Sequence, residues 1–187
     1  MYETRIKRVI RLVALLGITS VALQPIPVIR AAQTGHTVNL PSPLCDSLQV
    51  PEGNKFAFHV YARGVQIYRW NGATWDFVAP VAALFAEANY FGEVGSHYVG
   101  PTWESKSGSK VVGRRVQGTG CTPDPSAIAW LRLEKVSTSG SGIFSSVTYI
   151  QRVNTTGGTP PSDSGLNFGE MREVPYTAEY YFYRAQD

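Results

Sequence analysis

An alternation of apolar and polar side chains with a period of two begins at Phe56 and leaves few folds open. In this stretch Phe56, Phe58, Val60 and Ala62 alternate with Ala57, His59, Tyr61 and Arg63, a pattern typical of a half-buried β-strand. Further runs, separated by glycine- or proline-containing breaks, predict strands at 96–104, 109–117, 127–136, 143–154 and 173–184. Short strands at near-regular spacing predict an antiparallel β-barrel or β-sandwich.

The clearest local signal is Asn71-Gly72, which separates two strand-like segments, 65–70 and 73–78. Asn-Gly tolerates positive φ at both central positions of a type I′ turn, so we expect a two-residue hairpin in which Trp70 pairs with Ala73. This hairpin places four aromatic side chains on one face: Tyr68, Trp70, Trp75 and Phe77. Such a face is typical of a protein core, and a carbohydrate platform is the alternative.

Residues 80–89 predict the one helix of the domain. Pro80 suits a first helical turn, and apolar residues follow at helical spacing: Val81, Leu84, Phe85 and Ala88. We expect this helix to pack on a sheet edge or to close a barrel end. The expected fold class is therefore mainly all-β, with one short helix.

The first 22 residues have the composition of a cleaved signal peptide. Four basic residues precede an apolar stretch, 12–22, that is too short to span a bilayer comfortably. Small residues, Ser20 and Ala22, suit a cleavage site after Ala22. We expect a signal peptide at 1–22, an extended arm at 23–50, one β-rich domain at 51–187, and a secreted or cell-envelope protein. An uncleaved anchor or a buried N-terminal helix is the alternative.

Removal of the signal peptide changes the charge balance. The chain has 17 Lys and Arg against 14 Asp and Glu, and residues 1–22 hold four of the basic residues and one of the acidic residues. The remaining 13 of each give a neutral protein, which disfavours nucleic acid as a partner because phosphate binding needs a basic surface. No later apolar run approaches the ~20 residues of a transmembrane helix, so we expect no membrane association after signal cleavage.

The chain has two cysteines, Cys45 and Cys121. In an oxidising compartment the default expectation is a disulfide between them. Two separate thiols are the alternative, since the sequence alone does not show that their Cα atoms approach each other.

Several phrases of the sequence occur together in one known family. They include Gly-Val-Gln-Ile-Tyr at 64–68, His-Tyr-Val-Gly-Pro-Thr-Trp-Glu at 97–104, Ile-Gln-Arg-Val-Asn-Thr-Thr-Gly-Gly at 150–158 and Pro-Tyr-Thr-Ala-Glu-Tyr-Tyr-Phe at 175–182. Over about residues 48–184 the chain resembles the secreted family domain of unknown function 3455, found in bacteria and fungi. The resemblance implies an exported single domain with no established activity.

The sequence departs from that family in its cysteines. The resemblance implies one cysteine just after Gln-Ile-Tyr and another after the proline-rich loop, where this chain has residues such as Trp70 and Ser164. No family disulfide is therefore carried over to this chain.

The densest polar cluster runs from His97 to Glu104 and includes Trp103. On a single strand 96–104, His97 and Trp103 point to one side and Glu104 to the other, unless Gly100-Pro101 bends the chain. This cluster is a candidate ligand-binding rim. The alternative is a histidine that is hydrogen-bonded near a turn, beside a solvated glutamate.

A second candidate ligand-binding cluster consists of Arg152 and Asn154, where a strand ends and a loop opens. Its alternative is that Asn154 satisfies local turn hydrogen bonds. The three histidines are scattered without metal-ligand spacing. No nucleophile elbow, phosphate loop or dinucleotide fingerprint is present, so we assign no catalytic residue, no metal and no cofactor.

These features favour a non-enzymatic extracellular binding or surface protein whose partner is a small molecule or a polysaccharide. The rival hypothesis is a secreted hydrolase that uses Glu104 with His97 or with an acidic partner such as Asp76 or Glu93. Two of these groups within hydrogen-bond reach would favour the enzyme.

Overall fold

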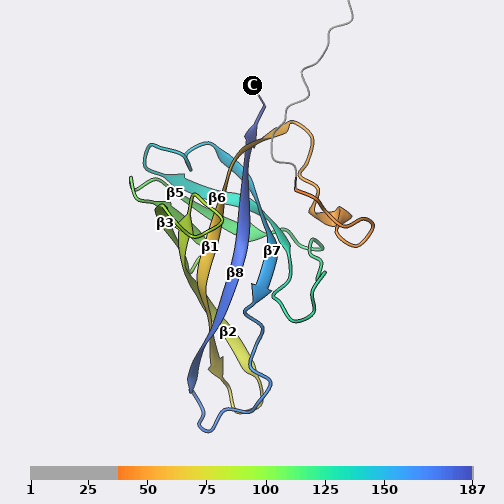
Figure 1. The fold of residues 1–187 in the computed structure, drawn as a ribbon, viewed down its shortest axis with the longest axis vertical. Helices are drawn as coiled ribbons and strands as arrows, with labels where there is room; N and C mark the ends of the chain where they lie inside the picture. Colours follow the sequence, from red (N-terminus) through yellow and green to blue (C-terminus); the bar gives the residue numbers. More distant parts are fainter. Residues whose placement is uncertain (1–37, 187) are drawn as a thin grey trace, which may run out of the picture. The chain divides into compact units, whose positions relative to one another are not determined.

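Eight antiparallel strands close into a barrel in the computed structural model, which describes residues 38–186 (Figure 1). The strands are β1 Asn54–Trp70, β2 Trp75–Phe85, β3 Glu93–Tyr98, β4 Thr102–Ser105, β5 Lys110–Arg115, β6 Leu131–Ser139, β7 Val147–Gly157 and β8 Met171–Ala185. Each strand pairs with its neighbours in sequence, and β1 pairs with β8 to close the circle. The predicted all-β class is confirmed, and of the two predicted architectures, barrel and sandwich, the structure is a barrel. The signal-peptide prediction lies outside the described residues.

The barrel interior is filled mainly by apolar and aromatic side chains. Along β8 every second residue faces inward, since Tyr176, Ala178, Tyr180 and Phe182 are all buried in one core cluster. Phe182 stacks on Phe58 with 4.7 Å between the ring centroids. The two long strands β1 and β8 run side by side through the view of Figure 1 and, with β2, extend beyond the shorter strands.

Phe56 does not share the inward face of Phe58, which corrects the predicted alternation. A register shift in the β1–β8 ladder lies between these two residues. The extra residue turns Phe56 outward, where its ring lies 6.0 Å from Tyr181 and 6.3 Å from Tyr183.

The hairpin at Asn71-Gly72 exists, but its predicted register is wrong. Trp70 pairs with Trp75 rather than with Ala73. The reason is that the Asn71 carboxamide oxygen accepts hydrogen bonds from the backbone N–H groups of Ala73 and Thr74 at 2.9 and 2.8 Å, which widens the turn to four residues. The aromatic pairs across it are Trp70–Trp75 and Tyr68–Phe77. Tyr68 and Trp75 are buried, as a core role requires, whereas Phe77 is 54% exposed.

The helix predicted at 80–89 is wrong, because 80–85 belongs to β2. Val81 pairs with Val65 of β1, and Ala82 pairs with His97 of β3. A short helix here would leave the backbone N–H and C=O groups at the edges of β1 and β3 without partners. In the closed barrel, β2 pairs with both strands. In residues 38–186 the only helical element is the 3-10 turn η1, Asp46–Leu48.

The strand predicted at 96–104 is two strands, β3 and β4, joined by a tight turn at 99–101. Gly100 has φ of +129°, a conformation that side chains other than glycine rarely adopt. The chain therefore reverses at Gly100-Pro101, and His97 pairs across the turn with Trp103.

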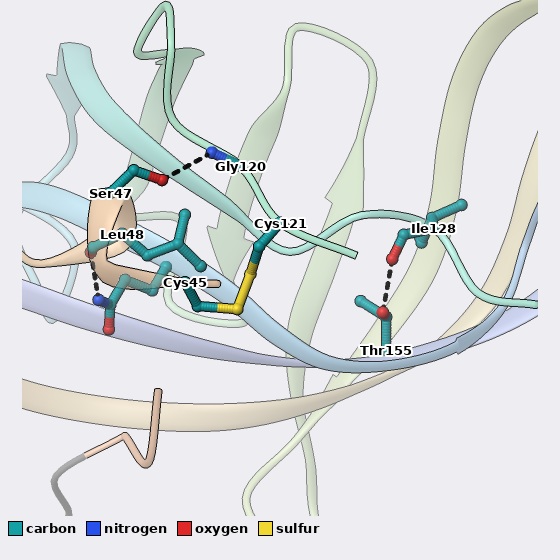
Figure 2. Close-up of a disulfide and its surroundings, with 8 residues drawn as sticks. Cys45, Ser47, Leu48, Gly120, Cys121, Ile128 and Thr155 are labelled. Atoms are coloured by element: carbon teal, nitrogen blue, oxygen red, sulfur yellow. Dashed lines mark hydrogen bonds between the residues drawn. A yellow bond between two sulfur atoms is a disulfide. The ribbon is translucent and has the colours of Figure 1, made fainter. Parts of the chain in front are cut away.

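The arm before the barrel is fastened by the predicted disulfide between Cys45 and Cys121, whose Cα atoms are 5.3 Å apart (Figure 2). Leu48 of η1 is fully buried beside it, and the Leu48 carbonyl accepts a hydrogen bond from Gln151 Nε2 at 2.7 Å. These residues form a second apolar cluster on the outer side of the barrel. The disulfide thus joins the arm to the loop between β5 and β6, residues 116–130, called here the β5–β6 loop.

The two positions where the family resemblance implies cysteines, Trp70 and the segment around Ser164, lie together in the structure, although this chain has no cysteine at either. A Cβ atom at Gly165 would lie 2.5 Å from Cγ of Trp70, so the indole packs directly on this segment. Trp75 Nε1 donates to the Asp163 carbonyl at 2.7 Å nearby. Tryptophan packing therefore holds the loop between β7 and β8 against the hairpin.

Candidate ligand-binding site

A cavity of about 300 Å³ lies at the end of the barrel where the odd-numbered strands finish and the even-numbered strands begin. Its walls are mainly apolar and include Phe77, Val78, Val99, Leu131 and Leu133. A second hollow of about 400 Å³ shares Phe77, Leu131 and Arg152 with it. The two hollows, called here the barrel-end cavity, together reach from the β3–β4 turn to the β5–β6 loop.

His97 lies in this cavity as a buried, neutral imidazole. Its side chain is 3% exposed and stacks on Trp103 with 4.5 Å between ring centroids. Nδ1 lies 2.8 Å from the Thr102 carbonyl oxygen, and because a carbonyl only accepts, Nδ1 carries the proton. Burial lowers the pKa of His97 to about 3, with Arg152 acting in the same direction and the Thr102 hydrogen bond against it. Nε2 is therefore an acceptor.

Arg152 brings a positive charge to the same cavity. Its Nε and Nη2 donate to the Ala129 carbonyl oxygen at 3.1 and 2.8 Å, which fixes one edge of the guanidinium against the β5–β6 loop. Burial raises the pKa of Tyr68, Tyr176 and Tyr180, and the charge of Arg152 opposes that rise in all three. Arg152 is therefore close to every one of these phenols.

Four buried polar groups around the cavity complete no hydrogen bond of normal geometry with the residues that the structure describes. They are Gln66 Nε2, Trp103 Nε1 and the hydroxyls of Tyr176 and Tyr180. All four side chains are 2% exposed or less. A buried donor without a partner costs about 1–3 kcal/mol, so this cluster is poor at stabilising the barrel and suited to meeting a polar ligand. Tyr68 differs, since its hydroxyl donates to the Gly158 carbonyl at 2.6 Å.

Of the candidate residues predicted from the sequence, His97, Trp103 and Arg152 come together and Glu104 does not join them. Glu104 follows the inward-facing Trp103 and so faces outside, where Tyr98 Oη donates to its carboxylate at 2.6 Å and Lys110 Nζ lies 3.3 Å away. The Tyr98 hydrogen bond is the main cause that lowers the pKa of Glu104. His97 and Glu104 are therefore on opposite faces of the sheet.

Asn154 also lies outside, although it is two residues after Arg152. Its φ is +49°, and the β7–β8 ladder shifts register between Val153 and Thr156. This local irregularity reverses the alternation, and Asn154 Nδ2 donates to Glu179 Oε1 at 3.1 Å.

The other carboxylates of the hydrolase hypothesis are likewise away from His97. Asp76 accepts a hydrogen bond from Asn71 in the hairpin turn, and Glu93 pairs with Lys106 at 3.5 Å. Residues 38–186 contain no group of three or more His, Cys, Asp or Glu side chains that could hold a metal ion.

Sequence reasoning missed Gln66, Tyr176 and Tyr180 as site residues. A signal was present, because a period of two places Tyr176 and Tyr180 on the same face as Ala178 and Phe182, and a buried phenol normally needs a hydrogen-bond partner. Which polar groups would surround them depends on the closure of the barrel, which the local pattern does not specify.

A comparison with family models matches residues 51–184 to the family described as "Protein of unknown function (DUF3455)". No curated protein and no solved structure matches the chain. In the described part of the chain, no helix is both long enough and apolar enough to cross a bilayer.

Proposed function

Since the chain belongs to the family of proteins of unknown function DUF3455, which assigns no activity, we propose a function from the geometry of the barrel. The protein is a secreted, non-enzymatic binding protein that takes a small molecule into the barrel-end cavity. The observation that carries this proposal is the set of buried polar groups that complete no hydrogen bond of normal geometry beside an apolar-walled cavity.

The combination has the features of a small-molecule site. Eight-stranded barrels have room for side chains or for one small ligand. Ligand sites are mostly apolar and carry a few convergent polar groups that fix orientation. Here His97 offers an acceptor, and Tyr180, Gln66 and Arg152 offer donors, so both kinds of hydrogen-bonding group are available.

A small molecule is favoured over a polysaccharide because the aromatic side chains are not arranged as an open platform. Tyr68 and Trp75 are buried, and Trp70 packs on Gly165 and Trp75. The disulfide supports export, since disulfides persist in oxidising compartments.

The test is a thermal-unfolding screen of the purified protein against small organic acids, alcohols, amines and sugars. A ligand that binds only the native state, at 100 times its Kd, stabilises by about 2.7 kcal/mol, which is a rise of roughly 5–10 °C for a domain of this size. We expect at least one class of small molecule to give such a rise.

The location is tested with two tryptophan substitutions on β6. Leu131→Trp fills the cavity and is expected to abolish the rise, whereas Val136→Trp, at an exposed position outside the cavity, is expected to leave it intact. A rise that survives Leu131→Trp would place the ligand elsewhere and contradict the proposed site.

A further inference from the structure

Building on the proposed function, we infer that the ligand is a small organic acid whose carboxylate binds Arg152 and whose apolar body lies against the cavity walls. Four observations of the cavity carry this inference: its charge, the free edge of the guanidinium, the donor groups nearby, and the apolar character of the remaining surface.

The cavity is positively charged and contains no compensating acid. Its lining includes two arginines, Arg115 and Arg152, and no Asp or Glu. In the described part of the chain neither arginine forms an ion pair with a carboxylate. Arg115 is exposed and solvated, but Arg152 is partly buried. A charge partly withdrawn from water favours a counter-charge close to it, so the single partly buried cation Arg152 favours a monoanion.

The guanidinium of Arg152 is held in place with donors to spare. A guanidinium has five N–H groups, and Ala129 engages only Nε and Nη2 through one carbonyl oxygen. The Tyr180 hydroxyl also interacts with this guanidinium, which leaves two of its five N–H groups for a ligand. Two parallel N–H groups match the two oxygens of a carboxylate, an arrangement that combines charge with fixed geometry.

The nearby polar groups are chiefly donors, which also suits an anion. The Tyr180 and Tyr176 hydroxyls and the Gln66 amide N–H group are nine-tenths or more buried. They lie near one another and near Arg152, but none of them completes a hydrogen bond of normal geometry among residues 38–186. Carboxylate oxygens only accept, so they satisfy such groups without a protonation change. A cationic ligand would meet Arg152 with like charge and would find no carboxylate in the lining.

The rest of the surface selects an apolar body. Phe77, Val78, Pro80 and Leu133 offer no hydrogen bond through their side chains, and the cavity of about 300 Å³ is at the small end of ligand pockets. A medium-chain or compact aromatic acid fits this description better than a sugar acid, whose hydroxyl groups would lose their hydration against these walls.

The experiment compares three probes that share one chain: decanoate, decan-1-ol and decylammonium. Isothermal titration at pH 7.5 is expected to give an affinity for decanoate at least tenfold above that for decan-1-ol, with decylammonium weakest. A hydrogen bond to a charged group contributes about 1.5–3 kcal/mol, so Arg152→Met is expected to weaken decanoate binding by roughly 10- to 100-fold while decan-1-ol binding stays within threefold. Arg114→Met, at an exposed arginine that pairs with Glu134 and lines neither hollow, is the matched control and is expected to change decanoate binding less than threefold.

A second measurement covers the case that Arg152→Met does not fold. In the wild-type protein the Kd for decanoate is expected to rise between 20 and 300 mM NaCl, and the Kd for decan-1-ol to stay constant, because salt screens only the charged contact. Equal affinities for decanoate and decan-1-ol, with no salt dependence, would overturn the acid specificity and leave small-molecule binding standing. If none of the three probes binds and the thermal screen is also negative, both proposals fail.

Discussion

Replacing Cys45 and Cys121 together by alanine is expected to lower the free energy of unfolding by about 4 kcal/mol. The disulfide closes a loop with a sequence separation of 76 residues, so its removal restores a large chain entropy to the unfolded state. At 2–4 °C per kcal/mol for a domain of this size, the thermal midpoint is expected to fall by roughly 8–16 °C. Alanine is chosen because both cysteines are buried among apolar residues.

The measurement is urea-induced unfolding followed by tryptophan fluorescence, without reductant. Ser47→Ala is the control, because Ser47 Oγ contributes only one long hydrogen bond, 3.4 Å from Gly120 N, between the same two segments (Figure 2). A loss below 1 kcal/mol for the double alanine variant would mean that the arm adds little to the domain. The same variant is expected to weaken ligand binding, since the β5–β6 loop that carries Cys121 also carries Ala129, the partner of Arg152.

The second large effect is a loss of stability in mild acid that depends on His97. The folded state keeps this imidazole neutral, with its pKa lowered to about 3, while in the unfolded chain its pKa is the ordinary histidine value of 6.5. Between these two values only the unfolded state takes up the proton, so the free energy of unfolding falls as the pH falls. The stabilisation is present above pH 6.5 and declines by about 1.4 kcal/mol per pH unit below it.

The surroundings of His97 explain why the folded state resists protonation. Arg152 of β7 contributes a like charge, Tyr180 of β8 lies 5.0 Å away as a neutral phenol, and Trp103 covers one face of the ring. Only the Thr102 carbonyl favours the charged form, and Nδ1–H already uses it.

His97→Gln isolates this effect, because glutamine keeps an N–H donor but does not titrate. Between pH 6.5 and pH 4.5 the wild-type protein is expected to lose about 2 kcal/mol more than the variant, measured by urea unfolding at several pH values. Parallel pH profiles for the two proteins would show that His97 accepts a proton in the folded state and would contradict its dry environment.

The strands of the barrel could be predicted where the apolar residues follow the two-residue period of a strand alone. They could not be predicted where the same residues also fit the 3.6-residue period of a helix. In the last strand apolar and aromatic residues alternate with other residues, and Tyr176, Tyr180 and Phe182 of this pattern all lie in the core. In 80–89, however, the small apolar residues fit both the 3.6-residue and the two-residue period, which short runs do not separate. The structure selects the strand because β1 and β3 both need a partner there.

The candidate site was predictable in part for a similar reason. Alternation in β3 and β4 places His97 and Trp103 on one face and Glu104 on the other, even though the chain reverses at Gly100-Pro101 and is not the single strand assumed from the spacing. Asn154 does not follow the strand alternation that would place it on the same face as Arg152, because its φ is positive. The sequence pattern did not predict this backbone conformation. The meeting of Arg152 with Tyr180 and Gln66 requires the closed barrel, because these residues come from β7, β8 and β1.

The most direct test of the barrel-end cavity as a ligand site is a ¹H–¹⁵N spectrum of the protein titrated with decanoate. The four tryptophan indoles report on different regions, and Trp103, stacked on His97, reports on the cavity. We expect saturable shifts of the Trp103 indole and the Arg152 Nε–H signals, while Trp130, in the cluster around the disulfide, stays unchanged. Shifts confined to Trp130 or to the hairpin tryptophans, with Trp103 and Arg152 unmoved at saturation, would contradict a ligand site inside the barrel end.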